Sequence, residues 1–390
     1  MKVKAFMSFE FINTHLDERK AQQLLRKRYL VQSATARTIT VNDKTYLNFA
    51  SNDYLGFGDS PVELTSAPLL GSHSSALVTG YQQPQQALEQ ALCSALGYEA
   101  GMLFNSGFSA NSSVIKALFQ DKATAQHSAI FQDKLNHASL IDGALHANAA
   151  LVRFNHNDIN HLRSRLEKSK ARNKLIVSEG VFSMDGDTAP IKALFTLAKQ
   201  HNAWLMIDDA HGFGVLGKSG LGSCEALIAA DTLPDILVIT FGKAVASSGA
   251  CVLGSQHFID YMLQFNRDYT YSTAMSPFIA AHTLARIKSI RDANDKRAKL
   301  NANIALFKRL AKEQHIALMD SNTAIQPIVL GCAEQTLKAS EQLKQQGIWL
   351  TAIRPPTVLH NTSRLRITLS AAHTHEDIKQ LVGGLQKVIS

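Results

Sequence analysis

The sequence predicts an α/β fold, with a large domain built on a mostly parallel central sheet and a smaller C-terminal α+β domain. The main observation is a series of short apolar runs, separated by segments in which apolar residues recur with helical spacing. Continuous apolar runs are typical of strands buried on both faces, as in a parallel sheet covered by helices. The second observation is the length of 390 residues, which is long for one compact core and therefore indicates two domains.

Six apolar runs are the expected strands of the large domain, at residues 101–104, 128–131, 151–154, 174–177, 204–207 and 236–239. The spacing of apolar residues between them predicts helices at 111–119, 158–169 and 189–201. After about residue 295 the rhythm changes, and helices are expected near 297–313, 334–346 and 375–388. These helices surround strand-like runs at 324–330, 348–353 and 364–369.

The domain organisation follows from these patterns. An N-terminal helix and arm are expected over residues 1–45, a large domain over 46–290 and a small domain over 291–390. Within the arm, residues 13–30 place leucines on one side of a basic segment, which predicts a single amphipathic helix.

Composition and charge exclude several classes of protein. The hydrophobic fraction of 45% and the charged fraction of 18% are ordinary for a soluble globular protein, and we expect no membrane span and no secretory signal. The cysteines, at positions 93, 224, 251 and 332, show no metal-binding spacing, which favours free thiols and a cytoplasmic location. The formal charge of +8 comes from scattered basic residues without a nucleic-acid-binding signature, so it favours an anionic substrate or an acidic carrier.

Reactive side chains follow five of the expected strands. Ligands of open α/β sheets bind beyond the carboxyl ends of the strands, so these positions sample the expected site. The segments are Asn105-Ser106-Gly107-Phe108, 133–137 (DKLNH), 179–183 (EGVFS), 208–211 (DDAH) and 240–243 (TFGK). Each residue alone also has an ordinary role, as a helix cap or a solvated turn residue. Their coincidence at one sheet edge is what predicts a catalytic site.

These residue types suit pyridoxal phosphate (PLP). An aldehyde cofactor needs an amine nucleophile, and Lys243 could hold it as a Schiff base. The pyridine nitrogen needs a carboxylate partner, for which Asp208 is best placed. The start of the helix expected after Gly107 would offer backbone N–H groups to the phosphate, and Thr240 could add a hydroxyl.

Three further residues could contact the cofactor ring. His211 and Ser183 could bond its phenolic oxygen, and His137 could stack its imidazole on the ring. A competing motif is G-x-G-x-x-G at 212–217, which is typical of dinucleotide binding. The residues after it, 218–222, are too rich in glycine for a helix, and the acid expected about 20 residues on is absent. A nicotinamide dehydrogenase is therefore disfavoured.

From about residue 11 to the end, the chain resembles the α-oxoamine synthases, which are PLP enzymes of fold type I. The matching stretches are 48–56 (NFASNDYLG), 136–139 (NHAS), 179–187 (EGVFSMDGD), 208–212 (DDAHG), 240–243 (TFGK), 354–358 (RPPTV) and 364–366 (RLR). The resemblance implies that Lys243 carries PLP, that Asp208 pairs with the pyridinium and that His137 stacks on the ring. The other cofactor contacts that it implies are Gly107, Phe108, Ser183, His211 and Thr240.

The resemblance also implies substrate contacts and an oligomer. Arg366 would hold the carboxylate of the amino acid, helped by Asn52, with His137 close by. Arg26 and Thr357 match positions that contact the acyl substrate or product. Members of the family are homodimers with sites at the subunit interface, where Thr273, in the segment 271–273, would reach the phosphate of the neighbouring subunit.

The activity implied by the resemblance is the decarboxylative condensation of an amino acid with an acyl thioester. The stretches 179–187 and 354–358 are most similar to the member of biotin synthesis, which implies L-alanine and a pimeloyl group on an acyl-carrier protein or coenzyme A. One alternative is glycine with an acetyl, succinyl or long acyl group. Another is a non-catalytic scaffold subunit, which the presence of Lys243, Asp208 and His137 disfavours.

The chain departs from the family's pattern at three places. The glycine-rich segment is represented by 71–80 (GSHSSALVTG), and Ala244-Val245-Ala246 follows the lysine where glycines are common. Asn361 stands where a glycine is usual, and asparagine tolerates a left-handed backbone. These departures concern the shape of loops and the acyl specificity.

Overall fold

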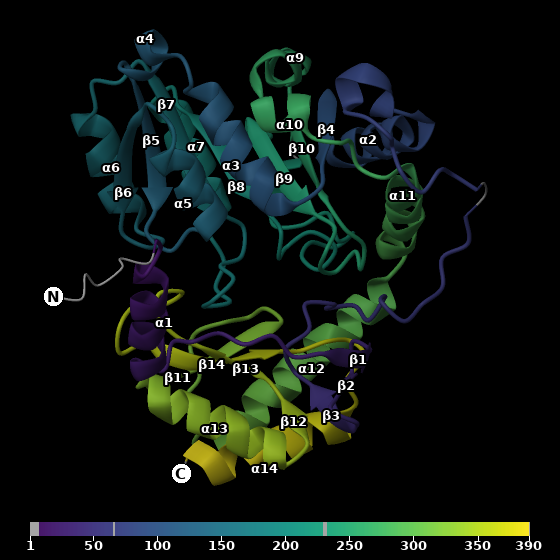
Figure 1. Ribbon diagram of the computed structural model, residues 1–390. Coiled ribbons are helices and arrows are strands. Elements are labelled where there is room, and N and C mark those ends of the chain that lie inside the picture. The colour runs from purple at the N-terminus through teal and green to yellow at the C-terminus, as the bar shows by residue number, and fades with distance from the viewer. Residues whose placement is uncertain (1–7, 65–66, 229–231, 390) are drawn as a thin grey trace, which may run out of the picture.

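The computed structural model describes residues 8–64, 67–228 and 232–389. Figure 1 shows two bodies, one built on the large sheet and the other on two smaller sheets, with the helices α11 (Pro277–Arg291) and α12 (Asn294–Glu313) leading from one to the other. No helix in these ranges is both long and apolar enough to cross a membrane.

The large sheet has the strand order β4-β10-β9-β8-β7-β5-β6. Its strands are β4 (Ala100–Phe104), β5 (Ser128–Asp133), β6 (Ala150–Phe154), β7 (Asn173–Glu179), β8 (Trp204–Asp208), β9 (Ile236–Thr240) and β10 (Ala250–Gly254). The six expected strands are confirmed, and β5 to β9 pair in parallel. Strand β10 was not predicted; it runs antiparallel to both β9 and β4, because only a loop connects it to β9.

Helices cover both faces of this sheet, as continuous apolar strands require. On one face Ile115 of α3 (Gly107–Leu118), Leu140 of α5 (Ala138–Leu145) and Phe258 of α9 (Gln256–Phe265) join the core. The other core contains apolar residues of α2 (Gln83–Leu96), α6 (Ile159–Lys168), α7 (Ile191–Gln200) and α11. Shorter helical segments are the π-turn Ala76–Gly80, α4 (Lys122–Ala125), α8 (Glu225–Ile228) and α10 (Arg267–Tyr271).

The smaller body contains the three expected helices, and its strands form two sheets, a division that was not predicted. One sheet has the order β11-β14-β13 and the other β1-β2-β3-β12. Their bounds are β11 (Ile325–Gly331), β14 (Ser363–Thr368), β13 (Thr351–Ile353), β1 (Val31–Ala34), β2 (Thr38–Val41), β3 (Lys44–Asn48) and β12 (Ile348–Trp349), and α13 (Ala333–Gln345) and α14 (His375–Ile389) follow the sequence prediction closely. The single run expected at 348–353 is divided, because β12 pairs with β3 whereas β13 pairs with β14.

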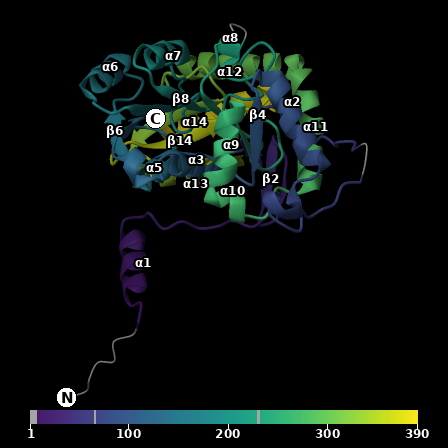
Figure 2. The ribbon, with the colours of Figure 1, turned by 90° about the horizontal axis from the view of Figure 1, so that it is seen from above.

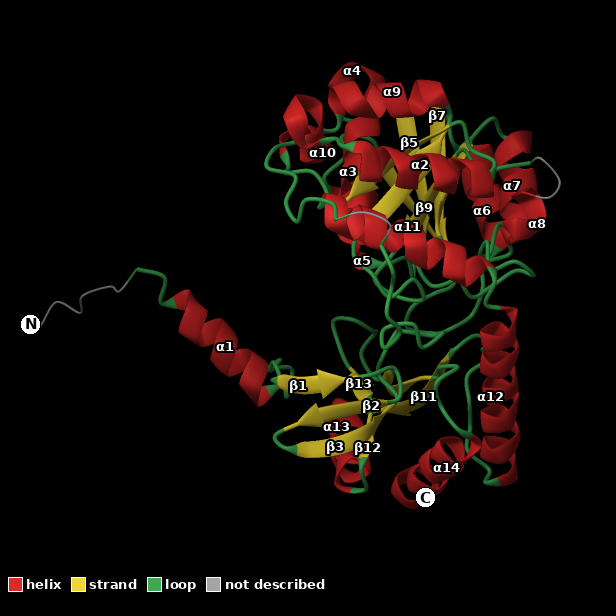
Figure 3. Cartoon of the chain, turned by 90° about the vertical axis from the view of Figure 1, so that its right-hand side faces the viewer, coloured by secondary structure: helices red, strands yellow, loops and turns green. Residues whose placement is uncertain are grey.

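The N-terminal arm differs most from its prediction. The helix expected over 13–30 is α1 (Phe11–Ala21), which has no buried residue and lies apart from the rest of the chain in Figures 2 and 3. It ends before Gln23, whose φ of 57° is left-handed and whose carbonyl accepts a bond from Arg354. Strand β3 crosses the expected limit at residue 45 and pairs with β12, so β1 to β3 share a sheet with the C-terminal part. The limits at 46 and 291 stay predictions.

Candidate active site

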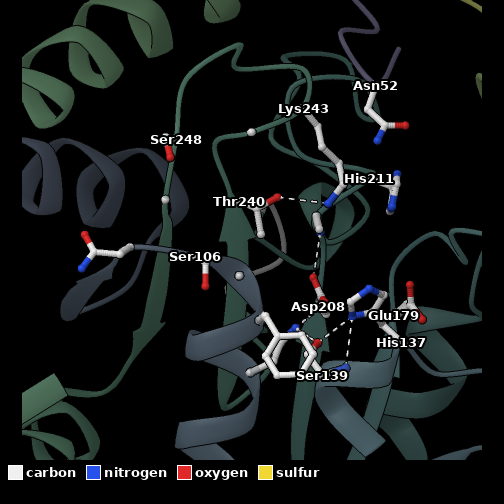
Figure 4. Close-up of a pocket in the computed structure, with 17 residues that line it drawn as sticks. Asn52, Ser106, His137, Ser139, Glu179, Asp208, His211, Thr240, Lys243 and Ser248 are labelled. Carbon is white, nitrogen blue, oxygen red and sulfur yellow. Dashed lines mark hydrogen bonds between the residues drawn. The ribbon is translucent and has the colours of Figure 1, made fainter. Parts of the chain in front are cut away.

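A cavity of about 320 Å³ lies at the carboxyl ends of the strands of the large sheet. Figure 4 shows side chains from several strands and helices turned toward it. The predicted residues in its wall are Asn52, Gly107, Phe108, His137, Asp208, His211, Thr240 and Lys243. The wall also contains residues for which no role was predicted, among them Asn111, Ser139, Glu179 and Ser248.

Lys243 follows β9 and directs its amine into this cavity, where Nζ lies 3.4 Å from the hydroxyl oxygen of Thr240. Burial lowers the pKa of Lys243, and the nearby carboxyl groups of Asp208 and Glu179 offset this only in part. An amine with a lowered pKa is more often unprotonated near neutral pH, and only the unprotonated form is a nucleophile or a base.

Asp208 ends β8, and hydrogen-bond donors hold its buried carboxylate. Its Oδ2 accepts a bond of 2.6 Å from the Asn111 amide, and its Oδ1 accepts one of 3.0 Å from the backbone N–H of Ala210. The Asn111 amide also donates to Ser139, at 3.0 Å. Asn111 lies four residues after Gly107 on α3, so both occupy the helix face next to the cavity. That spacing could have identified Asn111 in the sequence.

His137 caps the N-terminus of α5. Its Nδ1 accepts a bond from the backbone N–H of Ser139, at 3.2 Å, and lies 2.7 Å from the hydroxyl of the same serine. Burial lowers the pKa of His137. The imidazole is therefore neutral with its proton on Nε2, which suits a ring that stacks on an aromatic cofactor.

His211 is fixed by Tyr54, a residue that lies in the 48–56 stretch but was given no role. The Tyr54 hydroxyl lies 2.5 Å from Nδ1 of His211. Burial raises the pKa of Tyr54 to about 12, so the phenol keeps its proton, and burial moves the pKa of His211 well below its usual value. The phenol consequently donates to Nδ1, which leaves Nε2–H of His211 as a donor for another oxygen.

The start of α3 offers a place for an anion. Ser106 caps the helix by accepting a bond from the N–H of Ser109, at 3.1 Å, and the other N–H groups of the first turn have no partner within the helix. A Cβ at Gly107 would lie 2.6 Å from the methyl carbon of Thr240. Only glycine therefore fits at this point of close approach.

Glu179 is a buried acid in the cavity wall. Desolvation, with repulsion from Asp208, moves the pKa of Glu179 well above its usual value. Its Oε1 has no hydrogen-bond partner within the described ranges. The cavity thus combines an amine, a carboxylate held by donors, a helix start and an unsatisfied carboxyl group, and this donor set fits PLP.

Two predicted cofactor contacts lie outside the cavity wall. The backbone carbonyl of Ser183 accepts a bond of 2.7 Å from Arg366, and the carbonyl of Thr273 accepts one of 2.8 Å from Asn105. Thr273 lines a separate cavity of about 260 Å³. The roles assigned to Ser183 and Thr273 stay predictions.

Arg366 and Asn52 come together, with Nη1 of the arginine 3.2 Å from the amide oxygen of Asn52. The other bonds of Arg366 also go to neutral oxygens, those of Ser183 and Thr368. Arg364, two residues earlier on β14, forms an ion pair with Asp185 instead. Arg366 therefore suits a carboxylate ligand better than Arg364 does.

Arg26 and Thr357 also come together, at 3.3 Å, but away from the cofactor cavity. They line a larger cavity of about 860 Å³ between the N-terminal arm and the smaller body. The basic residues in its wall are Lys20, Arg26, Lys27, Lys344 and Arg354. A long acyl chain with an anionic end suits such a lining.

The departures from the family's pattern have local explanations. Asn361 has a φ of 61° and Ala246 a φ of 51°, so both adopt the left-handed backbone that glycine favours. In the competing glycine motif, a Cβ at Gly212 would lie 2.1 Å from the Asp209 carboxylate. That glycine serves close packing around a buried acid rather than dinucleotide binding.

Comparisons with known proteins agree with this site. Residues 44–385 match the model of the aminotransferase class I and II family. An 8-amino-7-oxononanoate synthase from Marinomonas sp. (strain MWYL1) is 46% identical, with 98% of this chain and 95% of the relative aligned.

Two solved structures are similar over most of the chain. A variant of the serine palmitoyltransferase from S. paucimobilis, solved with a bound PLP–myriocin aldimine, has a TM-score of 0.86 and 25% identity over 97% of each chain. The 8-amino-7-oxononanoate synthase from Francisella tularensis has a TM-score of 0.72 and 28% identity over 88% of this chain and 98% of that one. With the PLP-type cavity at the expected strand ends, these matches show that the chain belongs to the aminotransferase class I and II family and, within it, to the α-oxoamine synthases.

Proposed function

We propose that this enzyme condenses L-alanine with a pimeloyl thioester, releasing CO2 and the free thiol and forming 8-amino-7-oxononanoate for biotin synthesis. The observation that carries the proposal is the cavity in which the Lys243 amine and the Asp208 carboxylate face the same space. The 46% identity to a synthase of this name supports the choice of substrates.

When bound, PLP supplies the electron sink that stabilises negative charge at the α-carbon of the amino acid. Lys243 would anchor the cofactor through Nζ, and once free, its amine would take the α-proton. Its lowered pKa favours both tasks, because a protonated amine could do neither.

The other residues of the cavity would hold the cofactor in place. Asp208, fixed by the Asn111 amide at 2.6 Å, would accept a bond from the protonated pyridine nitrogen. The Nε2–H of His211 would donate to the phenolic oxygen, because Tyr54 occupies Nδ1. The first turn of α3, with Thr240 beside it, would bind the phosphate.

Arg366 would orient the carboxylate of alanine. A guanidinium donates two parallel bonds to a carboxylate, and Asn52 keeps Nη1 of Arg366 in place. The guanidinium would hold the alanine carboxylate, the group later released as CO2, at one fixed position.

The acyl group would bind toward Arg26 and Thr357, with the basic lining available for the far carboxylate of the pimeloyl chain or for the carrier. We also propose a homodimer in the cytoplasm. Thr273 lies outside its own chain's cofactor cavity, and Tyr271 is 75% exposed, so this segment is available to reach a second subunit.

The test is a comparison of kcat/KM for alanine with pimeloyl thioesters, on carrier protein and on coenzyme A, against glycine with acetyl and succinyl thioesters. The proposal predicts that alanine with pimeloyl is the best pair. If glycine with acetyl is better, the enzyme is a glycine C-acetyltransferase. If purified protein with PLP turns over none of the pairs, the scaffold alternative stands.

A further inference from the structure

A histidine outside the cavity links two of the loops that build it. His156 lies in the turn between β6 and α6, and each of its ring nitrogens contacts a carboxylate. Nδ1 lies 3.0 Å from Asp133 Oδ1, and Nε2 lies 2.7 Å from Asp187 Oδ2. The ring of Phe182 packs edge-on against the imidazole, with centroids 4.4 Å apart.

The two contacts imply a charged ring, because a histidine donates from both nitrogens only as an imidazolium. Burial lowers the pKa of His156, but the bonds to Asp133 and Asp187 outweigh it and raise the pKa to about 10. The side chain of Asp133 is only 1% exposed. A carboxylate buried to this extent needs a compensating charge, which His156 provides.

On one side, this cation shapes the loop that carries His137. Asp133 ends β5, and its Oδ1 also accepts the N–H of Leu135, at 2.8 Å. Its Oδ2 accepts the N–H of Asn157, at 2.8 Å. His137 lies four residues after Asp133. The bond from Leu135 to the Asp133 carboxylate therefore fixes the backbone of the loop that leads to His137.

On the other side, the cation holds the end of the loop 179–187. The Oδ2 atom of Asp187 also accepts a bond from the Asn157 amide, at 2.7 Å, and the carbonyl of Asp187 accepts the N–H of Phe182, at 3.0 Å. The same loop begins with Glu179, in the cavity wall, and carries the Ser183 carbonyl that receives the bond from Arg366.

We propose that His156, held between Asp133 and Asp187, is a positioning residue that fixes His137 relative to the loop 179–187. This inference rests on the proposed PLP-dependent reaction, since His137 is the group placed against the cofactor. A neutral side chain at 156 would leave two carboxylates without their shared cation, and the two loops would move apart. A misplacement of about 1 Å in a catalytic group can cost about 100-fold in rate.

The test uses the holoenzyme of His156→Gln, which removes the charge and cannot bridge both acids in the same way. The matched control is His146→Gln, which removes a histidine that lies 3.3 Å from Asp142 but is 64% exposed. We expect kcat of His156→Gln to fall about 10- to 100-fold, with the KM for the thioester within about twofold. The circular dichroism band of bound PLP should weaken. His146→Gln should match the wild type in kcat, in the KM for the thioester and in the PLP band.

A second variant tests the proposal in case His156→Gln does not fold. Asp187→Asn keeps the shape of a partially exposed side chain. It should lower kcat and weaken the PLP band, but by less than His156→Gln does. If the variants that fold lose thermal stability yet keep the wild-type kcat and PLP band, His156 only stabilises the fold and the proposal is overturned. The PLP band and an alanine titration need no thioester, so an error in the proposed acyl substrate would leave this test intact.

Discussion

The cofactor side and the substrate side of this site are built in different ways. On the cofactor side, Asp208 ends β8 and Lys243 follows the neighbouring strand β9 of the same sheet. On the substrate side, Arg366 meets Asn52 across 314 positions of sequence. Parallel strands bring their carboxyl ends together by topology, whereas the Arg366–Asn52 contact joins segments far apart in the sequence and depends on how these segments pack. The cofactor side should therefore be the more rigid, and substitutions there should reduce activity more than substitutions on the substrate side.

The largest effect is expected at the cofactor side, for Asp208→Asn. The variant should keep much of its PLP but lose about 100- to 1000-fold in kcat, because a neutral amide stabilises a protonated ring nitrogen poorly. Stopped-flow or steady-state turnover at saturating alanine measures this. Asp209→Asn is the matched neighbour, since Asp209 contacts Ser223 rather than the cavity. Near-normal turnover of Asp208→Asn would contradict the assignment of Asp208 as the partner of the pyridine nitrogen.

A smaller effect is expected at the substrate side, for Arg366→Lys. An ammonium cannot give the planar two-bond contact of a guanidinium, so the dissociation constant for alanine should rise about tenfold while PLP binding is spared. Spectral titration of the holoenzyme with alanine gives this constant. Arg364→Lys is the control, because its partner is Asp185, and it should reduce stability more than alanine affinity. An unchanged titration for Arg366→Lys would remove its assignment.

A weaker effect is expected for Arg26→Ala, farthest from the cofactor. An exposed charge contact contributes about 0.5 to 1 kcal/mol to binding, so kcat/KM for the pimeloyl thioester should fall measurably, by about two- to fivefold. The alanine dissociation constant should not change. An Arg26→Ala enzyme with unaltered pimeloyl kinetics would place the acyl groove elsewhere, while leaving the cofactor side as described.

The smallest effect is a pH dependence of stability. The pKa of His156 is raised from 6.5 to about 10. The charged imidazole therefore contributes fully to the free energy of unfolding below pH 6.5, and this contribution is lost as the pH rises toward 10. The charged groups around it are Asp133 and Asp187, with Arg153 beside Asp133. The Tm of the wild type should therefore fall more over this window than that of His156→Gln. Parallel Tm curves for the two proteins would contradict the linkage.

The sequence predicted the cofactor side well because strand-end residues can be located from local patterns. Buried apolar runs predicted six of the strands of the large sheet, and the residues after them include most of the cavity wall. Tyr54 was missed because a tyrosine after a strand carries no local sign of its partner, and Asn111 was missed although its spacing from Gly107 places it on the helix face next to the cavity.

The arm was predicted least well. Residues 24–30 have the composition of a helix, yet the chain leaves α1 at Ala21. Strands β1 to β3 join the smaller body through pairing with β12, about 300 residues later, and through the ion pair of Arg37 with Asp377, which no local pattern reveals. Ser183 lies outside the cavity wall and its backbone carbonyl is bonded to Arg366, so its contact with the cofactor stays a prediction.

The most direct test of this account is to identify the lysine that bears PLP. The holoenzyme is reduced with sodium borohydride, digested and analysed by mass spectrometry, with Lys243→Ala as the control. We predict that the phosphopyridoxyl group is found on the peptide that contains Lys243 and that the variant is unlabelled. A label on a different lysine, or no label on the wild type, would contradict the assignment of the cavity as the active site.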